Sequence, residues 1–232
     1  MELSDTILAT LGGTSFESRF RDVEALYAKI DSAQSNMRSD FPASKTLSCP
    51  PGCGTCCESF IPDVLPLEAE YIAAYLIATS RRANTPLQCA DKKGDGKQAC
   101  PFYNAEEPSA HCGIYPARAL ICRLFGFTPS LNRDNKPVLA LCKHMPSTLA
   151  DGARKISEVD LDRGAETDSK PGVATMSDFA QALIALSPDE AGDRRLLTEA
   201  LPSALARIGL LLSLASGNGG EPNESDPEPR AA

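Results

Sequence analysis

The sequence of 232 residues lacks several features that would assign it quickly to a functional class. It has no basic excess, because its net charge is -8, whereas non-specific binding to nucleic acid or anionic lipid requires a basic face. It has no apolar run close to the roughly 20 residues that span a bilayer. The first residues also lack the basic and apolar stretches of a secretory signal. We therefore expect a cytoplasmic protein with no nucleic-acid or membrane partner.

Histidine is scarce, with two residues, whereas cysteine is abundant, with nine. Thiols in the reducing cytoplasm rarely form structural disulfides, and an odd number cannot pair completely. Clusters of thiolate, a soft ligand, bind zinc, copper(I) or iron–sulfur assemblies in preference to magnesium or calcium. Metal binding is therefore the favoured explanation for the cysteines, and a protein partner cannot be named from the sequence.

Four cysteines fall within nine residues, at Cys49, Cys53, Cys56 and Cys57. The intervening prolines and glycines favour a tight turn that directs the first three sulfurs to one point. Cys56 and Cys57 are adjacent, so their side chains tend to diverge. The two residues then bind different metals, or one of them is a structural or reactive thiol.

A second group of cysteines follows in short segments at Cys100, Cys112, Cys122 and Cys142. Pro116 is suited to start a helical turn that would place Arg118 and Cys122 on one face. Residues 125–131 and 137–142 are predicted to form a hairpin that returns Cys142 towards Cys122. The predicted metal ligands are Cys49, Cys53, Cys56, Cys57, Cys100, Cys112, Cys122 and Cys142.

The order of these motifs resembles a bacterial cysteine-cluster family of zinc- or iron-chelating proteins. The matching features are the CxxCxxCC-like cluster at 49–57, Cys-Pro-Phe at 100–102, the block from Cys112 to Arg123, and Cys142. The chain departs from the family in the longer first gap, which puts Cys49 in doubt, and in Ala119 at a position usually held by proline. The resemblance implies zinc or iron, the latter as an iron–sulfur cluster. The family's distant similarity to flagellin lysine methylases leaves enzymatic activity undecided.

Three functions remain open on this evidence. The first is a metal-binding protein whose zinc or iron–sulfur centre folds an irregular segment, so that metal removal would unfold residues 49–142. The second is an iron–sulfur modifying enzyme, possible because Cys49, Cys53 and Cys56 share the spacing of radical S-adenosylmethionine enzymes. The downstream sequence, however, lacks the βα repeats of those enzymes. The third is a thiol redox or metal-delivery protein. No catalytic residue is assigned.

Several other residues have competing interpretations. Arg118 and Arg123 are predicted to bind a cofactor, by offsetting thiolate charge or by holding an anionic group, and a salt bridge would explain each of them equally well. Cys89 is interpreted as a spare thiol, and His111 and His144 as weaker ligand candidates than the cysteines. Glu68 and Glu70 are expected to favour the dipole of a helix start.

The predicted fold is mainly α with short β-hairpins, an irregular α+β cysteine-rich domain flanked by helices. Apolar spacing and caps predict helices near 15–37, 67–82, 177–186 and 203–215, with a separate helical pattern at 194–199. We divide the chain into an N-terminal helical segment (1–41), a metal-binding domain (42–146), a C-terminal helical segment (147–215) and a disordered tail (216–232). The first helix is expected to pack on the metal-binding domain.

Overall fold

The computed structural model describes residues 5–40, 54–79, 98–106, 111–140, 158–160 and 174–217. It is mainly helical with short antiparallel strands, which confirms the predicted fold class. The α-helices are α1 (Asp5–Thr10), α2 (Ser15–Asp40), α3 (Pro66–Ala78), α4 (Leu120–Leu124), α5 (Met176–Leu186) and α6 (Leu197–Gly217). Single 3-10 turns are η2 (Thr55–Glu58), η4 (Tyr115–Ala117) and η5 (Pro188–Glu190).

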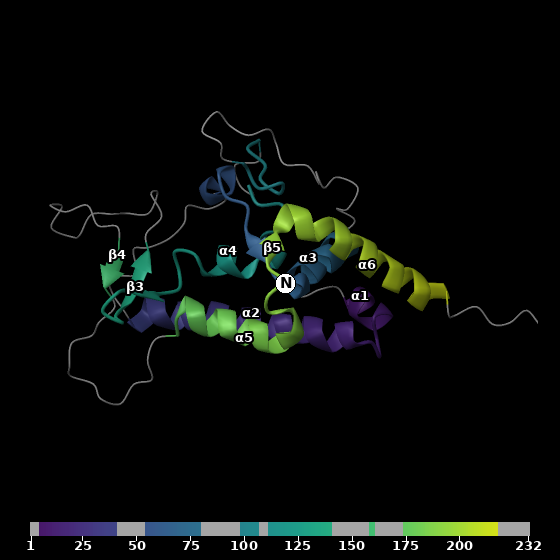
Figure 1. Ribbon diagram of the computed structural model, residues 1–232, viewed down its shortest axis with the longest axis horizontal. Helices are drawn as coiled ribbons and strands as arrows, with labels where there is room; N and C mark the ends of the chain where they lie inside the picture. The colour runs from purple at the N-terminus through teal and green to yellow at the C-terminus, as the bar shows by residue number, and fades with distance from the viewer. Residues whose placement is uncertain are drawn as a thin grey trace, which may run out of the picture.

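The helices pack in pairs around one hydrophobic core. The long helix α2 lies beside α5, and α3 packs against α6 (Figure 1). Phe20 and Ile30 of α2, Ile72 of α3, Leu124 of α4 and Leu205 of α6 all belong to this buried cluster. Because α2, α3 and α4 share one core, the expected packing of the first helix on the cysteine region is confirmed.

Two small sheets complete the described fold. Strand β1 (Asp63–Val64) pairs antiparallel with β5 (Arg195–Leu196), which joins the start of α3 to the start of α6. Strands β2 (Ser130–Leu131), β3 (Pro137–Ala140) and β4 (Glu158–Asp160) form the other sheet in the order β2-β3-β4. The predicted hairpin is therefore present, although its first strand is shorter than residues 125–131. Its turn uses Asn135 with a positive φ of 58°, which asparagine tolerates better than most residues.

Two helical predictions were wrong. Residues 197–217 form one helix that contains Pro202, and not two, because Leu201, Leu205 and Ile208 bury one continuous face of it. The turn that begins near Pro116 ends at Ala117, and α4 begins only at Leu120. Arg118 and Cys122 therefore do not share a single helix face.

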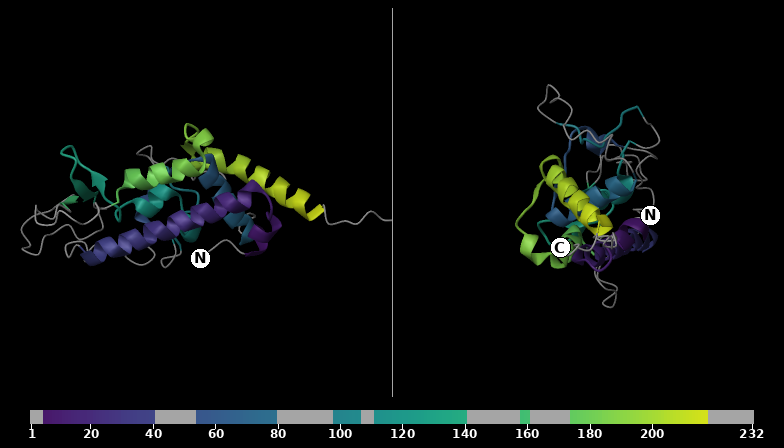
Figure 2. Two further views of the ribbon diagram at one scale, coloured as in Figure 1. Left: turned by 90° about the horizontal axis from the view of Figure 1, so that it is seen from below. Right: turned by 90° about the vertical axis from the view of Figure 1, so that its right-hand side faces the viewer.

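Helix α6 extends beyond the other helices at its C-terminal end (Figure 2). Residues 197–215 are long and apolar enough to cross a membrane by length and composition, and 28% of this window is buried inside the protein. Leu201 and Leu205 face the core, whereas Leu210 and Leu214 are exposed. Packing thus explains the apolar character of the first half of α6, whereas leucine side chains of the second half are exposed on the protein surface.

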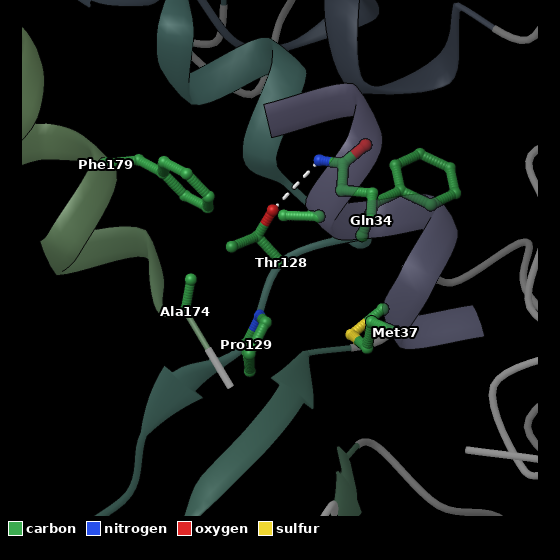
Figure 3. Close-up of a pocket in the computed structure, with 8 residues that line it drawn as sticks. Gln34, Met37, Thr128, Pro129, Ala174 and Phe179 are labelled. Carbon is green, nitrogen blue, oxygen red and sulfur yellow. Dashed lines mark hydrogen bonds between the residues drawn. The ribbon is translucent and has the colours of Figure 1, made fainter. Parts of the chain in front are cut away.

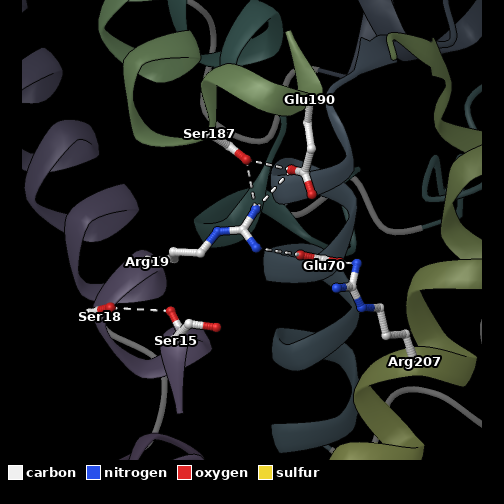
Figure 4. Close-up of polar contacts among 7 residues, drawn as sticks. All are labelled: Ser15, Ser18, Arg19, Glu70, Ser187, Glu190 and Arg207. Atoms are coloured by element: carbon white, nitrogen blue, oxygen red, sulfur yellow. Dashed lines mark hydrogen bonds and ion pairs between the residues drawn. The ribbon is translucent and has the colours of Figure 1, made fainter. Parts of the chain in front are cut away.

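An ion-pair network around the buried carboxylate of Glu70 links α2, α3, α6 and η5 (Figure 4). Glu70 of α3 is 2% exposed and accepts a hydrogen bond from Arg207 of α6 at 2.7 Å. Arg19 of α2 lies 3.8 Å from the other Glu70 oxygen and donates to Glu190 of η5 and to Ser187, the residue before it. The predicted role of Glu70 at a helix start is therefore too simple, since its carboxylate holds α2, α3 and α6 together.

A small cavity of about 20 Å³ lies where α2 meets α5 and the segment before β2 (Figure 3). Gln34 spans this region, because its side-chain amide donates to Thr128 Oγ1 at 2.9 Å and to the Arg123 carbonyl at 3.0 Å. The cavity is large enough for about one water molecule. Gln34 thereby fixes the C-terminal end of α4, which carries one of the predicted metal ligands.

Candidate metal centre

Cys56 and Cys57 lie on η2, a single turn that follows Gly54. The Cys57 amide donates to the Gly54 carbonyl at 2.8 Å, and the Cys57 carbonyl accepts from the Cys100 amide at 2.7 Å. The second of these bonds joins the first cysteine cluster to the Cys-Pro-Phe segment. Backbone hydrogen bonding therefore brings Cys57 and Cys100 together across a long stretch of sequence.

Cys112 is held beside Cys100 by a short antiparallel contact. Tyr103 and Cys112 form an isolated β-bridge, and the Gly113 amide donates to the Phe102 carbonyl at 2.9 Å. These contacts fold residues 100–113 back on themselves. The cysteines at the two ends of this segment consequently approach the same place.

Four thiols influence one another's ionisation around Cys57, whose side-chain interactions with Cys56, Cys100 and Cys112 shift the pKa values of all four. Hydrogen bonding from Cys57 lowers the pKa of Cys56 to about 6 and also lowers the pKa values of Cys100 and Cys112. Its bonds to Cys100, Cys112 and Cys56, together with burial, raise the pKa of Cys57 itself. The pKa values of Cys56, Cys100 and Cys112 are therefore shifted towards the thiolate form, and that of Cys57 towards the thiol.

Cys122 approaches this cluster from α4. Burial, followed by the negative charges of Cys100, Cys56 and Cys112, raises the pKa of the Cys122 thiol. The first residue of α4 is fixed by Glu68 of α3, whose carboxylate accepts from the Leu120 amide at 2.8 Å and the Leu65 amide at 2.9 Å. Glu68 is 1% exposed, so the sequence-based view of it as a helix-dipole residue misses its main contacts.

The two arginines predicted to bind a cofactor have different surroundings. Arg123 is buried, donates to both oxygens of Asp31 at 2.9 Å and to the Pro116 carbonyl at 2.8 Å, and lies over the Tyr27 ring. The salt bridge considered for it is therefore present. Arg118 donates to the Tyr115 carbonyl at 2.9 Å, and its guanidinium carbon lies 4.0 Å above the centre of the Tyr115 ring.

The side chain of His111 contacts the backbone of its own segment and the Tyr103 ring. Its Nδ1 lies 2.7 Å from the Asn104 carbonyl, and its ring packs against Tyr103. A Cβ atom at position 54 would overlap the His111 Cβ atom, so Gly54 is required for the close approach of η2 to this segment. The sequence showed the glycine, but nothing in its spacing identified His111 as its neighbour.

The described cysteines converge without forming a ready-made metal site. All five are free thiols, and no group of three or more histidine, cysteine, aspartate or glutamate residues within the described ranges is placed to hold a metal ion. Cys49, Cys53, Cys89, Cys142 and His144 lie outside the described residues.

Comparison with known proteins identifies the cysteine region. Residues 48–146 match the CxxCxxCC family model, which is described as a putative zinc- or iron-chelating domain. This match confirms the resemblance seen in the motifs. No curated protein sequence and no solved structure matches the chain.

Proposed function

We propose, from the premise that residues 48–146 carry a zinc- or iron-chelating domain of the CxxCxxCC family, that this protein binds zinc or an iron–sulfur cluster through its cysteines. The proposed ligands are drawn from the eight cysteines that fit the family pattern. The bound group would connect the segments around Cys57, Cys100, Cys112 and Cys122. We further propose that the protein acts in the cytoplasm.

The backbone contacts that bring the segments of Cys57, Cys100 and Cys112 together carry this proposal: the Cys100 amide donates to the Cys57 carbonyl at 2.7 Å, and Tyr103 and Cys112 form a β-bridge. Metals bind the thiolate form of cysteine, and metal binding therefore releases thiol protons. The lowered pKa values of Cys56, Cys100 and Cys112 favour that form before a metal arrives. The donor set fits a soft metal such as zinc or the iron of a cluster, and it offers no hard oxygen ligands.

The number of sulfurs bears on the form of the centre. A structural zinc ion takes four ligands, whereas five cysteines already converge among the described residues. The fifth thiol supports either a second metal site or an iron–sulfur cluster with one nearby cysteine that is not a ligand. Zinc would supply a rigid cross-link, and an iron–sulfur cluster would add electron transfer.

Metal analysis after anaerobic purification is the primary test. Iron and acid-labile sulfide in matching amounts, with broad visible absorbance, would identify a cluster, and colourless protein with stoichiometric zinc would identify structural sites. Protein that contains no metal and takes up neither zinc nor a reconstituted cluster would refute the proposal.

A pair of serine variants tests the ligand assignment. Cys57→Ser removes the thiol at the centre of the convergence, so we expect it to lose bound metal. Cys89→Ser is the matched control, because the sequence predicts that Cys89 is a spare thiol, and it should retain the metal. Equal metal content in the two variants would contradict the central position of Cys57.

The enzyme and redox alternatives predict different results in the same preparation. A modifying enzyme with an open iron requires the visible spectrum of the reduced cluster to change when S-adenosylmethionine is added. A thiol redox protein requires reversible oxidation of Cys56 or Cys57 in the metal-free protein. Stable metal content that neither treatment affects supports the structural role.

A further inference from the structure

A cleft that no cysteine lines lies between the start of α3, strand β5 and the first half of α6. Its volume is about 160 Å³, much larger than the cavity beside Gln34. Because about 10–15 Å³ of such volume holds one water molecule, the cleft has room for roughly ten of them. Ala69 of α3 and Ala200 and Ala204 of α6 line it, and their short side chains leave the space open. A ligand with about ten non-hydrogen atoms therefore fits.

Two of the segments that line the cleft each contribute one acidic and one basic side chain. Arg195 begins β5, and Asp193 lies two residues before it. Glu199 and Arg207 both lie on α6, and Ser203 lies midway between them. Residues four and eight apart fall on nearly the same side of an α-helix, so these three side chains form one row along the cleft. The cleft thus presents charges of both signs.

Glu70 fixes the position of Arg207. The Glu70 carboxylate is 2% exposed and accepts from Arg207 at 2.7 Å, and Figure 4 shows the two side chains pointing toward each other from α3 and α6. The Arg207 guanidinium also lies 5.1 Å from the centre of the Phe16 ring. A guanidinium has five N–H donors, and this hydrogen bond uses one of them. Since the Arg207 side chain is 53% exposed, its other donors can reach an anionic group in the cleft.

The other charged side chains of the cleft are unmatched. Asp193, Arg195 and Glu199 are exposed, and none of them forms an ion pair with another residue in the described ranges. Arg195 and Glu199 are only four apart in sequence and still do not pair. A purely anionic ligand would be repelled by the two acidic residues, and a purely cationic ligand by Arg195 and Arg207. A ligand with one group of each sign satisfies both sets of residues.

We propose that this cleft binds a small zwitterion of the amino-acid class. The ligand carboxylate accepts hydrogen bonds from Arg195 and Arg207, because the planar guanidinium matches the geometry of a carboxylate. The ligand ammonium donates to Asp193 and Glu199. The proposal is independent of the proposed metal binding, since none of the four residues lies in the cysteine region.

Saturation-transfer nuclear magnetic resonance tests binding without a tryptophan signal, which this chain lacks. The probe is an equimolar mixture of the twenty amino acids, added to the purified full-length protein. The strongest binder is then compared with its two analogues that lack the ammonium or the carboxylate group. We expect a Kd of about 1 mM or tighter for the amino acid. Each analogue should bind at least about tenfold more weakly, because it loses a set of charge-assisted hydrogen bonds.

Three variants place the ligand in the cleft. Glu199→Gln and Arg195→Gln each remove one unmatched charge at an exposed position, and each should weaken binding about tenfold. Ser203→Leu fills the cleft without changing its charge and should abolish binding. Asp22→Asn and Arg21→Gln are the matched charge controls on the exposed face of α2 and should bind as wild type does. Circular dichroism of each variant checks that α-helix content is retained.

Three results would overturn the inference. The first is that no amino acid binds, and the second is that an analogue with one charged group binds as tightly as the amino acid. The third is wild-type affinity in Glu199→Gln and Ser203→Leu, which would place the ligand elsewhere. If a glutamine variant fails to fold, Ser203→Leu and the analogues still decide. Metal content is measured in the same samples, so loss of amino-acid binding and failure of metal binding are recorded separately.

Discussion

Glu68 is the residue whose removal most directly tests how the helical core supports the cysteine region. Its carboxylate is 1% exposed and accepts hydrogen bonds from the Leu65 and Leu120 amides, at the starts of α3 and α4. Arg194 is the nearest ion-pair partner, at 3.9 Å. Replacing Glu68 with alanine leaves two buried backbone donors without an acceptor.

The cost follows from those two donors. Each unsatisfied buried donor costs about 1–3 kcal/mol, so the gross loss is about 2–6 kcal/mol. The net loss in the free energy of unfolding is smaller, because alanine also removes a carboxylate that burial destabilises, as the raised pKa of Glu68 indicates. We therefore expect Glu68→Ala to lower the free energy of unfolding by about 2–4 kcal/mol.

Urea unfolding followed by far-ultraviolet circular dichroism measures this difference. Asp22→Ala is the control, since Asp22 is an exposed acidic residue of α2, and its change should stay within about 0.5 kcal/mol. A Glu68→Ala protein as stable as the control would refute the reasoning, because it would mean that the two amides find other partners without cost. Metal affinity should fall in the same variant, since α4 carries Cys122.

Two further predictions concern the cap of α5 and metal removal. Thr175→Ala should cost about 1 kcal/mol, because the Thr175 hydroxyl and the Asp178 carboxylate cap the helix reciprocally. Hydrogen bonds from Thr175 lower the pKa of Asp178, so this contribution is present above about pH 4 and is lost as pH falls through the folded pKa. Unfolding at pH 7 and pH 3 should show the wild-type advantage shrinking, and an unchanged difference would contradict it. The sequence predicts that metal removal unfolds residues 49–142, but the core buries α3 within that range. We therefore expect chelation to abolish hydrogen-exchange protection in residues 111–124 and to leave α3 protected, and a uniform loss would show that metal and core unfold together.

The longer helices α2, α3 and α5 were predicted because each carries a local signal, whereas the short helices α1 and α4 were missed or misplaced. Phe16, Phe20, Val23, Tyr27 and Ile30 recur at helical spacing, and residues 15–37 are indeed helical. The division into a pattern at 194–199 and a helix at 203–215 was wrong because the strand β5 takes up residues 195–196 and one helix then runs from Leu197 to Gly217. Local patterns thus identify helices well, and they identify junctions poorly.

The candidate site was likewise predicted only in part. The spacing of the cysteines indicated a shared centre, and five of them do converge among the described residues. The central position of Cys57 could not be foreseen, since it results from the bond between its carbonyl and the Cys100 amide. Glu68 and Glu70 were equally hidden, because only the fold brings Leu120 and Arg207 to them. The roles of Cys49, Cys53 and Cys142 remain predictions.

The pairing of β1 with β5 sets an order of events during protein synthesis. Asp63 and Leu196 are partners, and more than half of the chain lies between them. Because a ribosome releases the N-terminal part first, every cysteine emerges before β5 and α6 exist to close the core over α3. The proposed metal ligands would thus be accessible on the nascent chain before the last helix closes the core.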